Sequence, residues 1–199
     1  MIRTLVLCLA MLSATLLAAC GSSPKSAFYL LGPDAALIRD GPAVPVHVVV
    51  GPVTIPDLVD RPQIVTRLNP NEVAVNEFAR WAAPLKSDIA RAIAADVGTL
   101  LGSEHVGVFD TEVAAWRVRV DVMVFESVPG ESVTLDARWT VRAPGKVAPA
   151  TGRTVARERV QGGGYDALVA AHDRALATVS RDIASAVRAG YAQAGRAPP

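Results

Sequence analysis

The clearest pattern in the chain is strict alternation of side chains from Trp116 to Phe125. Trp116 and the valines at every second position after it fall on one face, whereas Arg117, Met123 and Phe125 fall on the other. A period of two predicts a β-strand with one face on a core and one face in water. A turn at Pro129-Gly130 leads to a second alternating segment, so the two are expected to form an antiparallel hairpin.

Further strands are predicted on both sides of this hairpin. After it, Thr154 to Val160 is typical of a polar edge strand, and before it Val46 to Val50 is apolar on both faces, as in a central strand. Shorter strands are expected at Phe28 to Leu31, at Ile64 to Arg67 and at Val73 to Val75, and the last two are expected to pair across the Asn69-Pro70-Asn71 turn.

Two segments have apolar residues at spacings of three and four, which predicts amphipathic helices from Pro84 to Leu101 and from about Tyr165 to Tyr191. Pro84 suits a first helical turn, and Gly102 suits a stop. The charged residues of the first helix are expected on its solvent face: Lys86, Asp88, Arg91 and Asp96. These elements predict an α+β fold, a two-layer sandwich in which both helices pack on one face of a mostly antiparallel sheet.

The N-terminus carries a different signal. A positive charge at Arg3 and an apolar stretch from Leu5 to Leu17 are followed by Leu17-Ala18-Ala19-Cys20, which reads as a lipobox with Cys20 as the first mature residue. The apolar stretch is shorter than the roughly 20 residues of a spanning helix. An ordinary signal peptide with an incidental cysteine is the alternative. We expect Cys20 to be acylated, with palmitate among the chains, and so to anchor the protein in a membrane. Because no aspartate follows Cys20, we expect this to be the outer membrane, with the protein on its periplasmic side.

The domain organisation follows from this signal. We expect a signal peptide at 1–19, a lipidated tether at 20–26, a single domain at 27–192 and a frayed tail at 193–199. The chain has 20 Lys and Arg and 19 Asp and Glu, so loss of Arg3 leaves 19 of each. This neutral balance argues against nucleic-acid binding.

No catalytic constellation stands out in the sequence. The three histidines, His47, His105 and His172, lack a second His or Cys at metal-ligand spacing, so we expect no metal or other cofactor. Nucleophile-elbow and phosphate-loop motifs are absent, and Gly162-Gly163-Gly164 is expected to be a flexible connector. We therefore predict that the protein is not an enzyme.

The proline-rich segment from Gly51 to Trp81 is predicted to be a long ordered loop with a binding surface. The alternative is that its arginines satisfy loop carbonyls and nearby acids. Candidate partner-binding residues are Arg61, Pro62, Gln63, Arg67, Arg80 and Trp81. On this interpretation, Arg61→Ala or Trp81→Ala weakens partner binding more than folding.

The residues of this segment also carry a resemblance. The pieces Asp60-Arg61-Pro62-Gln63-Ile64-Val65 and Arg80-Trp81…Pro84-Leu85 resemble the PqiC-like family of ABC-type transport auxiliary lipoproteins. The match extends from Phe28-Tyr29-Leu30 to Asp182-Ile183-Ala184. The resemblance implies an outer-membrane lipoprotein that works with inner-membrane-anchored MCE-domain proteins and their transporter partners.

The expected function is therefore a docking or scaffold component of an MCE-type intermembrane lipid transport system that supports membrane integrity. Two alternatives stay open: a lipid-binding carrier, which needs an enclosed apolar cavity, and an envelope hydrolase, which needs a nucleophile. The sequence also leaves open a homo-oligomer.

Overall fold

The computed structural model describes residues 24–39, 41–109, 114–145 and 148–195. Its larger sheet has the strand order β5-β2-β6-β7-β8. The strands are β2 (Val48–Thr54), β5 (Val106–Gly107), β6 (Trp116–Val128), β7 (Ser132–Arg142) and β8 (Ala150–Arg159). The β6–β7 hairpin and the edge position of β8 were predicted, but β2 pairs parallel with both β5 and β6, so the sheet is mixed. The apolar β2 lies between two strands, in agreement with the central position expected for it.

The alternation of β6 changes phase part-way along the strand. Val122 pairs with Ala137 and Val124 with Asp136, which leaves Met123 as an extra residue in the ladder. A bulge of this kind turns the following side chains over. As a result Phe125, predicted on the wet face, is buried, whereas Val120 and the earlier valines are buried as expected.

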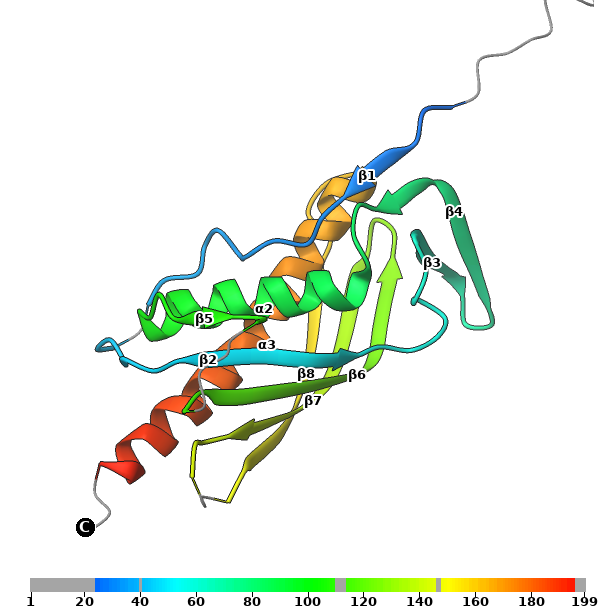
Figure 1. Cartoon of the computed structure of the whole chain (residues 1–199). Coiled ribbons are helices and arrows are strands. Elements are labelled where there is room, and N and C mark those ends of the chain that lie inside the picture. Colours follow the sequence, from blue (N-terminus) through cyan, green and yellow to red (C-terminus); the bar gives the residue numbers. More distant parts are fainter. Residues whose placement is uncertain (1–23, 40, 110–113, 146–147, 196–199) are drawn as a thin grey trace, which may run out of the picture.

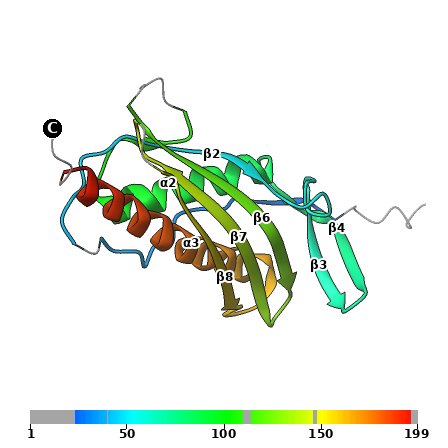
Figure 2. The same cartoon turned by 90° about the horizontal axis from the view of Figure 1, so that it is seen from below.

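The helices are α2 (Leu85–Leu101) and α3 (Gly164–Ala194), and both cover one face of the larger sheet (Figure 2). Helix α2 follows Pro84 and ends at Gly102, whose left-handed φ of 61° suits glycine. Helix α3 runs through Ala194, so the first residues of the predicted tail are helical, and 196–199 lie outside the described residues. Among the described residues, no helix is long and apolar enough to cross a bilayer.

A second sheet has the order β1-β4-β3, from β1 (Ala27–Tyr29), β3 (Gln63–Asn69) and β4 (Glu72–Trp81). The short strands predicted at Ile64–Arg67 and Val73–Val75 are confirmed as parts of the antiparallel β3–β4 hairpin. The expectation of a continuous long loop from Gly51 to Trp81 is therefore wrong over the hairpin. Strand β1 pairs parallel with β4. This three-stranded sheet lies at one end of the molecule, and the C-terminal end of α3 lies at the other (Figure 1).

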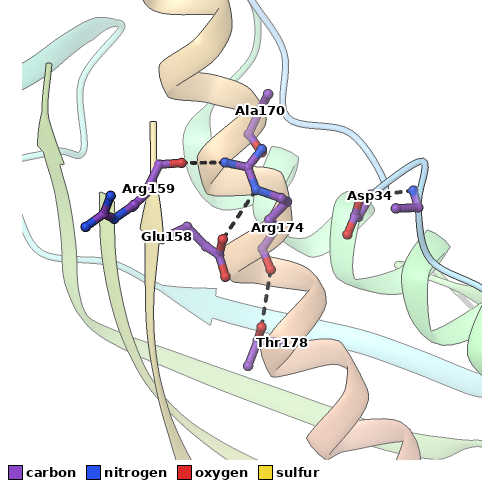
Figure 3. Close-up of polar contacts among 7 residues, drawn as sticks. Asp34, Glu158, Arg159, Ala170, Arg174 and Thr178 are labelled. Carbon is purple, nitrogen blue, oxygen red and sulfur yellow. Dashed lines mark hydrogen bonds and ion pairs between the residues drawn. The ribbon is translucent and has the colours of Figure 1, made fainter. Parts of the chain in front are cut away.

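Arg174 of helix α3 forms hydrogen bonds with the edge strand β8 (Figure 3). Arg174 donates to the carbonyl of Arg159 at 2.6 Å and to Glu158 at 3.3 Å. A third bond joins Arg174 to the Ala170 carbonyl within the helix. The guanidinium thus links the edge of the larger sheet to the helical layer.

Candidate functional site

The sequence motifs of the hairpin converge on one surface. The backbone N–H of Trp81 donates to the carbonyl of Pro62 at 2.7 Å, and Gln63 pairs with Arg80 across the β3–β4 ladder. Together they border a surface pocket of about 390 Å³, here called the hairpin pocket. Its lining residues are Asp60, Arg61, Pro62, Trp81, Ala82, Ala83, Pro84 and Leu85. Residues 20 apart in sequence therefore form a single hollow at the start of α2.

The three arginines of this region differ in their surroundings. Arg67 forms an ion pair with Glu126 and donates to the Pro70 carbonyl at 3.1 Å, so it ties the hairpin to β6. Within the described part of the chain, the side chains of Arg61 and Arg80 form neither hydrogen bonds nor ion pairs. The structure thus separates Arg67, which fits the structural alternative, from two cations that are available to another molecule.

Arg61 stands on the rim of the hairpin pocket. It is exposed, and Asp60 beside it forms an ion pair with Lys86 of α2 at 2.6 Å. Because Lys86 already pairs with Asp60, the charge left for a partner is that of Arg61. A carboxylate or phosphate group is the complementary ligand for an exposed guanidinium.

Trp81 is a buried residue that lines the floor of the hairpin pocket. Only 5% of the residue is exposed, and its ring meets Phe125 edge-on with 6.1 Å between ring centroids. Trp81 was predicted as a partner contact, but the structure places its side chain in the core. Its main contribution is to hold the pocket floor and the start of α2 in place.

A histidine and a serine meet inside the core beneath this site. His172 stacks on Phe125 with 4.0 Å between ring centroids, and its Nε2 is 2.8 Å from Oγ of Ser127. Complete burial lowers the pKa of His172 to about 3, so the imidazole is neutral at physiological pH. Its Nδ1 has no hydrogen-bond partner among the described atoms. The pair is closed to substrates and acts as a polar contact between β6 and α3.

The remaining histidines form a separate pair. His47 and His105 stack with 4.4 Å between ring centroids. Across the described residues, no cluster of three or more His, Cys, Asp or Glu side chains is arranged to hold a metal ion.

Three carboxylates hold the segment that follows β1, here called the N-terminal strap (Leu31–Asp34). Asp88 accepts a hydrogen bond from the N–H of Leu31 at 3.0 Å. Asp173 accepts from Gly32 at 3.0 Å, and Asp96 accepts from Asp34 at 3.1 Å. The strap is therefore fixed to both helices through its backbone.

The prediction that Asp88 and Asp96 face water is wrong, because both are buried. Burial raises the pKa of Asp96 to about 6, and it raises the pKa of Asp173 to about 6 as well. A signal was present in the sequence: Asp88 follows Leu85 by three positions, and Asp96 follows Ile93 by three. That spacing places both carboxylates on the apolar face of the helix.

A small groove lies between the hairpin and β6. It measures about 180 Å³, and Leu58, Val65 and Met123 are among its apolar lining residues. Ligand pockets usually measure about 300–1,000 Å³. The groove is therefore small for the enclosed cavity that a lipid carrier needs.

The sequence model described as the ABC-type transport auxiliary lipoprotein component matches residues 29–184. The chain belongs to this family. The match confirms the resemblance inferred from the hairpin motifs, and it spans both sheets and most of α3. The family is one of transport auxiliary lipoproteins rather than a known enzyme family.

Solved structures with the same fold agree with this assignment. One crystal structure, of an uncharacterised protein, has a TM-score of 0.68 at 18% identity and covers 82% of this chain and 99% of its own. Another, of a Xanthomonas campestris protein described as DUF330, has a TM-score of 0.61 at 18% identity, with 85% and 99% covered. No match is found among curated proteins. At this identity the structural likeness establishes the fold.

Cys20 lies outside the described residues, as do the predicted signal peptide and the first part of the tether. The described residues start at Pro24, three residues before β1. The family assignment agrees with a lipoprotein, and lipidation at Cys20 stays a prediction from the lipobox.

Proposed function

We propose that this transport auxiliary lipoprotein is the docking component of an MCE-type intermembrane lipid transport system. Cys20 carries the lipid anchor in the outer membrane, 1–19 is removed, and 20–26 tethers the domain on the periplasmic side. The domain holds an inner-membrane-anchored MCE-domain protein and its transporter partners in position. Family membership over residues 29–184 and the Leu-Ala-Ala-Cys sequence support this role.

The observation that carries the docking role is the convergence of the two family motifs on the hairpin pocket. Its walls are backbone and apolar side chains, and Arg61 supplies a cation on its rim without an internal partner. A protruding acidic or amide-bearing segment of a partner fits this arrangement. The action is geometric: the anchor fixes the domain to one membrane, and the pocket fixes the partner to the domain.

Site-specific photocrosslinking tests the docking site. A photoreactive amino acid is placed at Arg61 in the full lipidated chain, and the matched control replaces Arg142, an exposed arginine on β7. We expect the MCE-domain protein to be recovered from the Arg61 position and to be absent or much weaker at Arg142. Equal recovery from both positions, or no MCE-domain protein at either, would contradict the docking site.

A second experiment tests the anchor. Cys20→Ala should move the protein out of the outer-membrane fraction and lower resistance to envelope stress. If both membrane fractionation and resistance stay unchanged, the lipid anchor is not part of the function.

A further inference from the structure

Large apolar side chains are exposed together on one face of the three-stranded sheet. Phe28 is 64% exposed, Leu30 is 57% exposed and Phe78 is 47% exposed. Phe28 pairs with Arg80 in the β1–β4 ladder, and Phe78 precedes Arg80 by two residues. The β3–β4 ladder is irregular between Asn76 and Arg80, but Ala79 and Trp81 are buried whereas Phe78 is exposed, which places Phe78 on the same face as Phe28. Leu30 continues the alternation from Phe28 just beyond β1. We call Phe28, Leu30 and Phe78 the apolar sheet face.

The opposite face of the same strands already has its packing partners. Ala79 and Trp81 are buried there, and Tyr29 lies 5.7 Å from Tyr165 of α3 between ring centroids. The core therefore accounts for one face of β1 and β4 and leaves the other uncovered. Single exposed apolar residues are common on soluble domains, but a cluster of large ones indicates an interaction surface.

The position of this face relative to the anchor indicates what covers it. Phe28 is eight residues after Cys20. A fully extended chain spans at most about 3.6 Å per residue, so the patch lies within about 29 Å of the acylated residue. The described chain also begins at this end of the molecule, away from the C-terminal end of α3 (Figure 1).

The charges beside the patch are mixed. Lys25 precedes β1, and Arg80 lies in the same cross-strand row as Phe28 and Gln63. On the same strand, Glu77 and Glu72 are exposed carboxylates. Aromatic and leucine side chains with nearby Lys and Arg match the interface between acyl chains and lipid phosphates.

We infer that the apolar sheet face rests on the lipid bilayer into which Cys20 is anchored. The inference rests on the proposed function only for that anchor. Phe28, Leu30 and Phe78 enter the interfacial region, and Arg80 meets lipid phosphate groups. The contact orients the domain rather than attaching it, because the acyl chains already provide attachment. The hairpin pocket then lies close to the membrane, and the C-terminal end of α3 points into the periplasm.

Fluorescence of single labelled positions tests this orientation. Phe28→Cys and Phe78→Cys are made in the full lipidated chain, with Tyr191→Cys near the end of α3 as the control. Tyr191 is also exposed and lies in the last turn of α3, whose C-terminal end is at the opposite end of the molecule (Figure 1). The proteins are labelled with an environment-sensitive thiol dye and reconstituted into vesicles of phosphatidylethanolamine and phosphatidylglycerol.

We expect the dye at positions 28 and 78 to be blue-shifted and quenched several-fold more by acyl-chain spin labels than the dye at position 191. Equal quenching at all three positions would overturn the inference. Shielding in native envelopes but not in pure-lipid vesicles would also overturn it, because the occupant would then be a protein.

Two measurements on the unsubstituted protein separate the membrane contact from the lipid anchor. A lipid-borne carbene probe on the unsubstituted protein should label peptides that contain Phe28 and Phe78, without any variant. The unsubstituted protein also reports on the anchor, because an acylated Cys20 thiol does not react with the dye. Labelling at Cys20 would refute the anchor, whereas a blocked Cys20 with water-exposed positions 28 and 78 would refute the membrane contact alone.

Discussion

At the scale of single residues, two of the carboxylates that hold the N-terminal strap, Asp96 and Asp173, combine two opposing effects. Each accepts a backbone hydrogen bond, which favours the ionised form, and each is removed from water, which disfavours it. Desolvation is the larger effect for Asp96 and Asp173, since the pKa of each is raised from 3.8 to about 6. The folded protein consequently binds protons at these two groups more tightly than the unfolded chain does.

This difference predicts how stability depends on pH. Because the pKa values are raised on folding, the contribution of both groups is complete below about pH 4, falls as pH rises toward 6, and is constant above that. Asp96→Asn and Asp173→Asn keep a carbonyl acceptor for the strap and remove the charge. We expect each variant to gain stability relative to the unsubstituted protein as pH rises from about 4 to 7.

Denaturant unfolding at a series of pH values checks this prediction. His172 changes stability in the opposite sense, because its pKa is lowered to about 3 and its contribution is lost as pH falls below about 6.5. His172 contributes equally in the variant and in the unsubstituted protein, so its effect cancels when their free energies of unfolding are subtracted at each pH. If this difference in the free energy of unfolding stays constant between pH 4 and 7, the raised pKa values of Asp96 and Asp173 are contradicted.

A tryptophan and an arginine on the hairpin pocket should behave differently. Trp81→Ala removes a buried ring that packs on Phe125, so we expect a loss of about 3–5 kcal/mol in the free energy of unfolding. Arg61→Ala changes an exposed side chain and should alter stability by less than about 0.5 kcal/mol. Thermal melting measures both. Equal destabilisation would show that Arg61 has a structural role.

At the scale of whole elements, β6 is the strand on which the larger sheet depends. It pairs with β2 on one side and β7 on the other, and Val120 on it is fully buried. Val120→Asp places an unpaired charge in the core, so we expect a loss of at least about 3 kcal/mol or failure to fold. Met123→Asp on the same strand is the matched control, because Met123 is exposed at the bulge.

Soluble yield and urea unfolding distinguish these two variants. The Met123→Asp protein should remain close to the unsubstituted protein. Similar loss in both variants would mean that any charge on β6 disrupts the sheet, and that burial of Val120 is not the cause.

The same strand shows how far sequence patterns predict this fold. Local periodicity was enough for both helices, for the β6–β7 hairpin and for the edge strand β8. It could not place the bulge at Met123, because the phase change depends on how β7 pairs with β6. The parallel pairing of β2 also depends on contacts between distant segments, which alternation does not encode.

The candidate site was likewise predicted only as far as local sequence patterns reach. The motifs around Arg61 and Trp81 identified the right region, since they form one pocket. The two short strands of this region were predicted, but β4 runs on to Trp81, well beyond the expected end at Val75. Pro62 and Pro70, which indicated a loop, lie just outside the two ends of β3 and do not interrupt it. Whether an arginine is paired depends on a distant partner, as Glu126 is for Arg67, and no local pattern predicts that.

At the scale of the whole molecule, the short tether and the uncovered sheet face both determine how the domain is placed at the membrane. The tether limits its distance from the bilayer, and the sheet face sets its tilt. Only six residues, 21–26, separate Cys20 from β1. A lengthened tether would leave the anchor and the fold intact and change only this placement.

Insertion of about 20 Gly and Ser residues between Ser22 and Ser23 tests whether placement matters. A flexible chain of that length has an end-to-end distance of about 25 Å, so the domain would sample positions well away from the bilayer. We expect lower resistance to envelope stress and weaker crosslinking of position 61 to the MCE-domain protein, with unchanged acylation and melting temperature. Replacement of Ser22-Ser23 by Gly-Gly, which keeps the length, should have no effect. If the protein with the insertion keeps full envelope-stress resistance and full crosslinking at position 61, then the partner binds the hairpin pocket at any distance of the domain from the bilayer. The anchor would then serve only to retain the protein at the membrane.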